Sequence, residues 1–411
     1  MIFQNFSKRQ TLTLTWWAKD KFKDREGVIC DGSIRSGKTV SMTIGFILWS
    51  MSRFNGHSFA ICGKTIGSLR RNVILQMPTW LEGIFTVIEK QGEHKLIIKC
   101  GDTINQYYLF GGKDESSAAL IQGMTLSGVL FDEVALMPRS FVEQALARCS
   151  VEGSKYWFNC NPENPGHWFY NEWIKKAKKR NVLYLHFTMD DNLSLSKRIK
   201  DRYEATYSGV FYLRYILGLW VKAEGLVYPM FDREEHIVDT IPPYNMRHRY
   251  YVSIDYGTVN PFSASLYDFD PINEQAIKIK EYYHKGGSSN RIDNEGYYKK
   301  IKELVGDYPI EYIIIDPSAA SMIETIQKYS EFIVLRAEND VLNGIQVVTR
   351  CLNGGYIKFY KECKNTFEEF NTYSWDEKSG DDRVIKENDH AMDDLRYFCY
   401  TILRKELKWI L

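Results

Sequence analysis

The first residues that could do chemistry form a glycine-rich run near the start of the chain. A G-x-x-x-x-G-K-T motif follows a short apolar segment and precedes a helical pattern at 40–50. Glycines in such a loop let backbone N–H groups surround phosphate oxygens, and the following helix N-terminus favours their negative charge. We expect Lys38 to reach the β- and γ-phosphates of a nucleotide and Thr39 to bind Mg²⁺. The predicted nucleotide-binding residues are Gly32, Ser33, Ile34, Arg35, Ser36, Gly37, Lys38 and Thr39.

Two neighbouring carboxylates could supply the other half of a nucleotide hydrolase. Asp132 and Glu133 follow the apolar run 128–131, which predicts a buried strand that ends in two acids. We expect Asp132 near the Mg²⁺ and Glu133 where it can polarise the attacking water. Alone, such a pair is more typical of a capped strand end. Together with an upstream phosphate loop, it predicts nucleotide hydrolysis.

Three further polar residues carry less specific signals. Arg35 could contact the γ-phosphate from within the loop, or it could be an ordinary solvated residue. Asn159 and Asn161 come at the end of an apolar run and would suit a sensor of the γ-phosphate. Asn-Pro also begins ordinary turns, so both interpretations of these two residues stay open.

Acidic residues in the second half of the chain are placed where a metal centre would need them. Asp255 and Asp316 each end an apolar run, while His390 and Asp393 lie three residues apart on one face of a predicted helix. Such carboxylates can hold two divalent ions that stabilise the attacking and leaving oxygens of a phosphodiester. Oxygen ligands favour Mg²⁺ or Mn²⁺ over zinc. Each acid alone is more typical of a strand end or helix cap, but the set predicts a nuclease.

The elements that must position these residues follow two patterns, both of the α/β class. In the first half, short apolar runs alternate with helical patterns, which is typical of a mostly parallel sheet. The second half has the strand, hairpin, strand and helix order of a ribonuclease-H-like fold. Glycine and proline residues between 225 and 245 indicate a boundary. We predict an ATPase domain at 1–225, a linker at 226–245 and a nuclease domain at 246–411.

The apolar runs also predict individual elements. Residues 188–224 are expected to be helical, and a last helix is expected from about residue 388. Strands are expected at 28–31, 59–62, 129–132, 156–159, 182–187, 250–255 and 310–316, with hairpins across 95–110 and 263–283.

Net charge conceals a difference between the halves. The 411 residues carry a net charge of +1, but residues 1–225 hold 30 Lys and Arg against 21 Asp and Glu, a net of +9. The remaining residues hold 23 against 31, a net of −8. This asymmetry favours polyanion handling in the first half and clustered carboxylates in the second, although solvated faces could differ by chance.

One basic run is dense enough to contact DNA phosphates. Residues 175–180 hold five cations in six positions. The run could contact the DNA backbone without sequence preference, or it could simply be the solvated face of a helix.

Compartment and membrane signals point to the interior of a cell. No apolar run reaches the roughly 18 residues that a transmembrane helix needs. Residues 1–9 show no secretory signal. The eight cysteines contain no C-x-x-C pair, which is typical of buried thiols in a reducing compartment.

Taken in order, these motifs resemble the large terminase subunit of tailed double-stranded-DNA bacteriophages. That resemblance implies an N-terminal ASCE-type P-loop ATPase domain that translocates double-stranded DNA into the procapsid. It also implies a C-terminal nuclease domain that cuts concatemeric DNA. The resemblance is carried by residues 31–39, 130–133, 159–162, 218–220, 255–257, 260–261, 315–317 and 389–397.

The resemblance also implies roles for individual residues. ATP with Mg²⁺ would bind Lys38 and Thr39, and Glu133 would be catalytic. Gln10 is our candidate for adenine recognition, and Arg139 and Arg148 are both candidates for an arginine acting on a neighbouring subunit. The remaining implied roles are coupling of hydrolysis to movement at Asn159 and Asn161, and binding of two divalent ions by Asp255, Asp316 and Asp393 with support from His390.

Partners and location follow from the same resemblance. They are double-stranded DNA, the portal protein of the procapsid, the small terminase subunit and further copies of the chain in a ring. The isolated chain could still be monomeric. The location would be the cytoplasm of the bacterial host, with no membrane partner.

Two other functions fit parts of the sequence. A cellular helicase-nuclease of DNA repair shares the ATPase half, but we find no second helicase core in the sequence. An assembly scaffold that binds nucleotide without turnover would have no need of Lys38 and Glu133.

Overall fold

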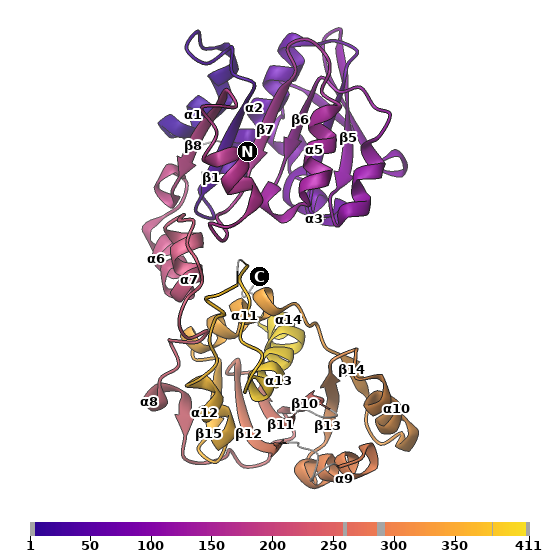
Figure 1. The fold of residues 1–411 in the computed structure, drawn as a ribbon, viewed down its shortest axis with the longest axis vertical. Helices are drawn as coiled ribbons and strands as arrows, with labels where there is room; N and C mark the ends of the chain where they lie inside the picture. Colours follow the sequence, from indigo (N-terminus) through magenta and orange to yellow (C-terminus); the bar gives the residue numbers. More distant parts are fainter. Residues whose placement is uncertain (1–4, 258–260, 286–291, 380, 408–411) are drawn as a thin grey trace. The chain divides into compact units, whose positions relative to one another are not determined.

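The computed structural model describes residues 5–257, 261–285, 292–379 and 381–407. The chain folds into two compact units (Figure 1). Unit 1 comprises residues 1–203 and 212–222, and unit 2 comprises residues 204–211 and 223–411.

Unit 1 is built on a sheet whose order is β3-β4-β5-β2-β6-β7-β1-β8 among the described residues. Neighbouring strands from β5 to β8 are parallel, while β3, β4 and β5 form an antiparallel edge. One strand, β7, therefore separates β1 from β6. The strands are β1 (Gly27–Gly32), β2 (Ser58–Gly63), β3 (Thr86–Lys90), β4 (Lys95–Cys100), β5 (Thr103–Gly111), β6 (Gly128–Phe131), β7 (Lys155–Asn159) and β8 (Val182–Phe187).

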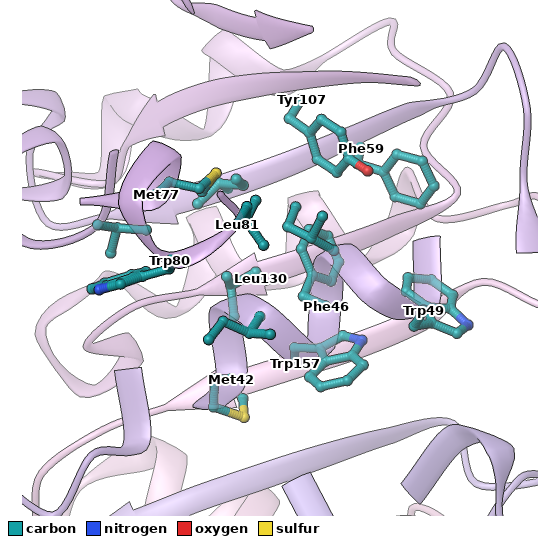
Figure 2. Close-up of a cluster of buried hydrophobic side chains, with 14 of the residues drawn as sticks. Met42, Phe46, Trp49, Phe59, Met77, Trp80, Leu81, Tyr107, Leu130 and Trp157 are labelled. Carbon is teal, nitrogen blue, oxygen red and sulfur yellow. The ribbon is translucent and has the colours of Figure 1, made fainter. Parts of the chain in front are cut away.

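Helices cover both faces of this sheet because strand side chains alternate between the two faces. Phe46 and Trp49 from α2 lie in one core among aromatic side chains of the strands (Figure 2). The ring centroids of Phe46 and Trp157 are 5.9 Å apart. The opposite core contains α5 (Arg139–Ala147). Of these two helices, α2 spans Lys38–Arg53. The other α-helices of unit 1 are α1 (Lys8–Thr15), α3 (Ile66–Leu69), α4 (Met77–Trp80) and the part of α6 (Lys197–Thr206) up to residue 203.

Unit 2 has a mixed sheet with the order β14-β13-β10-β11-β12-β15-β9 among the described residues. The strands β10, β11 and β12 form an antiparallel meander, and β13 pairs with β10 in parallel. The strands are β9 (Ile237–Val238), β10 (Arg249–Asp255), β11 (Phe262–Asp270), β12 (Gln275–His284), β13 (Ile310–Ile315), β14 (Val334–Arg336) and β15 (Ile357–Tyr360).

The two faces of β10 contact different helices. Val252 and Ile254 point into a core with α9 (Asn294–Val305) and α10 (Ala320–Tyr329). Ser253 and Asp255 point to the opposite face, where Ser253 Oγ donates to the carbonyl of Asp394 on α13 (His390–Phe398). The other helices of unit 2 are α7 (Gly209–Phe211), α8 (Arg233–His236), α11 (Val341–Asn353), α12 (Lys364–Phe370) and α14 (Arg404–Glu406).

Both units are α/β, as the sequence predicts. The predicted strands and both hairpins are present with ends within two residues, and the last helix begins at His390. The prediction of helix throughout 188–224 was wrong: this segment contains a 3₁₀ turn at Met189–Asp191, α6, α7 and a π-helical turn at Tyr212–Ile216, and residues 217–224 are irregular. Gly218 has φ +74°, which a helix cannot continue through. The segment predicted as a linker, 226–245, contains α8 and β9.

No helix in the described part of the chain is long and apolar enough to cross a membrane.

Candidate functional site: a phosphate loop and a carboxylate cluster

The glycine-rich loop joins β1 to the N-terminus of α2, as its spacing predicts. Gly37 is the N-cap of α2 and has φ +81°, in the left-handed region that favours glycine. A Cβ at this position would also come 2.3 Å from Gln10 Nε2. The loop is therefore held in a conformation that only glycine fits, with the helix N-terminus directed at it.

Lys38 is buried, and its ammonium group is held inside the loop. Lys38 Nζ donates to the carbonyls of Gly32 (3.1 Å) and Ser33 (2.6 Å), to Ser36 Oγ (3.2 Å) and to Asn161 Oδ1 (3.1 Å). Burial lowers its pKa from the ordinary lysine value. A bound phosphate would supply the negative charge that this buried cation lacks.

Thr39, Asp132 and Asn159 form one hydrogen-bonded cluster. Thr39 Oγ1 donates to Asp132 Oδ1 (3.3 Å), and Asn159 Nδ2 donates to both Asp132 Oδ1 (2.7 Å) and Thr39 Oγ1 (2.9 Å). Burial raises the pKa of Asp132, although the hydrogen bonds from Asn159 and Thr39 oppose the shift. The hydroxyl and carboxylate oxygens are donors that Mg²⁺ takes, and a cation here would stabilise the buried carboxylate.

Glu133 sits just beyond this cluster with φ +60°. Its carboxyl group faces the same cavity, and burial, reinforced by the neighbouring Asp132, raises its pKa to about 7. A positive φ in a glutamate is uncommon and turns the side chain away from the strand direction. Glu133 therefore lines the cavity from a backbone conformation that is uncommon for its residue type.

All these groups line one cavity of about 540 Å³ at the carboxyl ends of the parallel strands. Ligands of open α/β sheets bind at this edge. Five lining residues were not predicted from the sequence: Val40, Arg71, Asn72, Trp80 and Asn192. Val40 directly follows the predicted loop, and Asn192 follows β8, the neighbour of β1, so both could have been found. Arg71, Asn72 and Trp80 come from a connection with no periodic signal. The lining residues are Ile34, Arg35, Ser36, Gly37, Lys38, Thr39, Val40, Arg71, Asn72, Trp80, Asp132, Glu133, Asn159, Asn161 and Asn192.

Two predicted site residues, Gln10 on α1 and Arg35 within the loop, make contacts that hold the loop. Gln10 Nε2 donates to the carbonyl of Ser36 (3.3 Å), and Gln10 Oε1 accepts from the backbone N–H of Ser7 (3.0 Å). The guanidinium of Arg35 lies over the ring of Tyr203 at 5.5 Å. Gln10 thus braces the loop, and Arg35 is partly held by an aromatic ring.

In unit 2, the two strand-end carboxylates face each other across a tyrosine. The hydroxyl of Tyr397 on α13 donates to Asp255 Oδ1 (3.4 Å) and to Asp316 Oδ2 (3.3 Å). His390 Nδ1 lies 2.6 Å from Asp255 Oδ2. The structure therefore brings Asp255, Asp316 and His390, which the sequence singled out, close together.

Asp393 joins this group from α13, with both its oxygens engaged by cations. Arg396 donates to Asp393 Oδ1 (2.8 Å), and Lys386 Nζ donates to Asp393 Oδ2 (3.1 Å). Lys386 Nζ also lies 3.0 Å from Asp389 Oδ2. Lys386 and Tyr397 were not singled out from the sequence, since neither has a spacing that marks it.

The pKa values of the cluster reflect burial together with the hydrogen bonds made by each group. Burial raises the pKa of Asp255, opposed by the hydrogen bond with His390. Burial alone would lower the pKa of His390, but the bond to Asp255 and nearby carboxylates raise it. Burial would raise the pKa of Asp316, but hydrogen bonds from Ser318, Asn339 and Tyr397 lower it.

A cavity of about 520 Å³ opens onto this cluster. Among the described residues, no group of three or more His, Cys, Asp and Glu side chains is arranged to hold a metal ion. The donor type nevertheless fits Mg²⁺ or Mn²⁺, because the side chains there offer carboxylate oxygens, although Lys386 and Arg396 bind the two oxygens of Asp393 in this structure. Asn260, which belongs to one of the motifs above, lies outside the described residues. The lining residues are Asp255, Tyr256, Gly257, Pro261, Lys386, Glu387, Asn388, Asp389, His390 and Asp393.

A family model and several solved structures match this chain. A family model described as terminase large subunit, T4likevirus-type, N-terminal matches residues 29–235. The large terminase from a thermophilic bacteriophage, in its second crystal form, is 49% identical, with a TM-score of 0.91 over 97% of this chain and 100% of that chain. The comparison with curated proteins finds no match.

Two further structures of the same thermophilic phage terminase contain nucleotides. The complex with ADP is 48% identical with a TM-score of 0.87, and the complex with ATP-γ-S is 47% identical with a TM-score of 0.87. Each match covers 97% of this chain and 100% of that chain.

Proposed function

The chain belongs to the large terminase family, and we propose that its two units divide the work of that family between separate cavities. A large terminase is a DNA-packaging ATPase and a nuclease, and this chain has both activities. It has the P-loop ATPase and ribonuclease-H-like α/β architecture of those proteins. The observation that carries our division is that Lys38 and Glu133 share one cavity in unit 1, whereas Asp255, His390 and Asp393 share another in unit 2.

The cavity of unit 1 binds ATP and hydrolyses it. Backbone N–H groups of residues 32–39 and the N-terminus of α2 hold the phosphates, and Lys38 turns from its loop carbonyls to the β- and γ-phosphates. Thr39 and Asp132 would hold Mg²⁺, which would neutralise charge that develops on the phosphates. Glu133 orients and deprotonates the attacking water. Gln10 contributes by bracing the loop, and Arg35 lies where it can reach the nucleotide.

Coupling of hydrolysis to movement runs through the end of β7. Asn161 accepts from Lys38, and Asn159 donates to both Thr39 and Asp132. These two residues therefore contact the lysine, the hydroxyl and the carboxylate that surround the nucleotide phosphates. A change in the phosphates would alter the hydrogen bonds at this strand end.

The residues around the cavity of unit 2 catalyse the cutting of DNA. Asp255, Asp316 and Asp393 would hold two divalent ions, Mg²⁺ or Mn²⁺, which would supply activation of a water molecule and stabilisation of the leaving oxygen. His390 holds Asp255 in place through a 2.6 Å contact. Arg396 fixes Asp393, while Lys386 provides a cation beside the position of the DNA phosphate.

DNA packaging implies the partners of this chain. The substrate is double-stranded DNA, and the chain acts as a ring of identical subunits on the portal protein of the procapsid, together with a small terminase subunit. The ring forms on the procapsid, in the cytoplasm of the bacterial host. Arg139 and Arg148, at the two ends of α5, are the candidates for an arginine that acts on a neighbouring subunit.

Metal removal tests both activities of the full chain. We expect plasmid DNA to be cut in Mn²⁺ or Mg²⁺ and left intact in EDTA, and we expect ATP turnover to stop in EDTA as well. Gel analysis of the plasmid and release of inorganic phosphate measure the two reactions. Cutting that continues in EDTA would contradict the two-metal nuclease.

The basic run at 175–180 is a candidate DNA contact. Lys176 is paired with Glu172 (2.9 Å), whereas Lys178 and Lys179 are exposed. Replacing Lys178 and Lys179 by glutamine should weaken binding equally for different DNA sequences and reduce the slope of log K against log salt by about 2. Binding of two unrelated duplexes across a salt series measures this, with Lys176→Gln as the control. If the slope of log K against log salt did not change, residues 175–180 would be a solvated surface that does not contact DNA.

A further inference from the structure

The helix that carries His390 and Asp393 does not cap its own N-terminus. The N-cap residue of α13, Asp389, makes no side-chain hydrogen bond to the first turn. The first N–H groups of a helix have no partner within the helix and need one from elsewhere. The first turn of α13 therefore depends on another part of the chain.

Glu369, near the end of α12, supplies this partner. Its Oε2 accepts from the backbone N–H groups of Ala391 (2.7 Å) and Met392 (3.0 Å). The residue is 3% exposed, so water does not compete effectively for these bonds. A carboxylate at a helix N-terminus is also favoured by the helix dipole.

One strand of the sheet holds Glu369 and the helix that carries it. Glu369 Oε1 accepts from the hydroxyl of Tyr283 on β12 (2.7 Å). Glu281, also on β12, accepts from the N–H groups of Asn365 (2.7 Å) and Thr366 (3.2 Å) at the start of α12. Thus β12 fixes both ends of α12, and α12 fixes the start of α13.

We propose that Glu369 is a positioning residue of the nuclease, which sets His390 and Asp393 against Asp255 by fixing the first turn of α13. This inference rests on the nuclease function proposed above. Three protein donors engage the two oxygens of Glu369, so it acts through α13 and not on the DNA. Displacement of catalytic groups by about 1 Å costs about a hundredfold in rate, so a loosened α13 should slow cutting strongly.

Two substitutions distinguish the hydrogen bonds that Glu369 makes to the first turn of α13 from the negative charge of its carboxylate. Glu369→Gln keeps an oxygen that can accept from Ala391 and Met392, and its amide can donate to the Tyr283 hydroxyl. Glu369→Ala removes every one of these bonds. Glu368, the exposed neighbour on α12, provides a matched control as Glu368→Ala, because it loses the same group one residue away.

The experiment uses the full chain with single-turnover plasmid cleavage in Mn²⁺, DNA affinity and hydrogen exchange of residues 390–398. We expect Glu369→Ala to cut about a hundredfold more slowly, with unchanged DNA affinity and faster exchange of these amides. Glu369→Gln should recover most of the rate, and Glu368→Ala should match the unmodified chain. ATP turnover should be unchanged in all three variants.

Two results would overturn the proposal: wild-type cutting by Glu369→Ala, or equal losses in Glu369→Gln and Glu369→Ala, which would make the charge decisive. If Glu369→Ala does not fold, near-wild-type cutting by Glu369→Gln with slow amide exchange at 390–398 supports the cap, and loss of cutting in that folded variant rejects it. Failure of the proposed nuclease is distinct, because then the unmodified chain would cut no DNA.

Discussion

Replacing Glu133 by glutamine is expected to stop ATP turnover while nucleotide binding survives. Glutamine has nearly the same size and can keep the φ +60° backbone and the position in the cavity. It cannot accept a proton from the attacking water, and loss of a general base costs about 10²–10⁴-fold in rate. We therefore expect kcat for ATP to fall by that factor, measured as phosphate release, while the Kd for ATP-γ-S changes little.

A control within unit 1 tests whether this effect belongs to the cavity. Glu143 is exposed on α5 and is paired with Arg139 (2.6 Å), so Glu143→Gln makes the same chemical change outside the site. This variant should hydrolyse ATP normally. If Glu133→Gln also retained turnover, another group would have to be the base. If Glu133→Gln folded but no longer cut plasmid DNA, the division of the two activities between two cavities would be wrong.

Most residues that line the cavity of unit 1 could be predicted from the sequence to lie together, for a geometric reason. The spacing from Gly32 to Thr39 fixes a loop between a strand and a helix, and the carboxyl ends of parallel strands meet at one edge of the sheet. Asp132 and Asn159, each at the end of a strand, must therefore approach Thr39. Arg71 and Trp80 enter the cavity from a connection whose path depends on tertiary packing, so no local pattern marks them.

The carboxylate cluster was predictable only in part. Asp255 and Asp316 follow strands, and alternation along β10 places Asp255 on the same face as Ser253. The position of Lys386 depends on how a loop folds back over α13, and no periodicity records that. Glu369 is equally hidden, because beside Glu368 it resembles the solvated end of a short helix. Only the packing of α12 on α13 shows that one of the two glutamates is buried.

Asp255→Asn should have the largest effect on DNA cutting and none on ATP turnover. The amide keeps the shape of the carboxyl group, so its contacts with His390 and Tyr397 can persist. The negative charge that would hold a divalent ion is lost, and removing one group that stabilises a developing charge costs about 10²–10³-fold. We expect plasmid cleavage in Mn²⁺ to fall by at least this factor, measured by single-turnover conversion of supercoiled DNA.

Unit 2 contains a second aspartate–histidine contact, which provides a control for the general effect of replacing a buried aspartate. Asp268 is 3% exposed, and its Oδ1 lies 2.8 Å from His248 Nδ1, so it repeats the aspartate–histidine contact outside the cavity. Asp268→Asn should leave cutting intact. Equal losses in Asp255→Asn and Asp268→Asn would mean that folding, not metal chemistry, is disturbed. Loss in Asp255→Asn alone, with ATP turnover preserved, would place the cutting reaction at the end of β10 and show that ATP hydrolysis does not depend on Asp255.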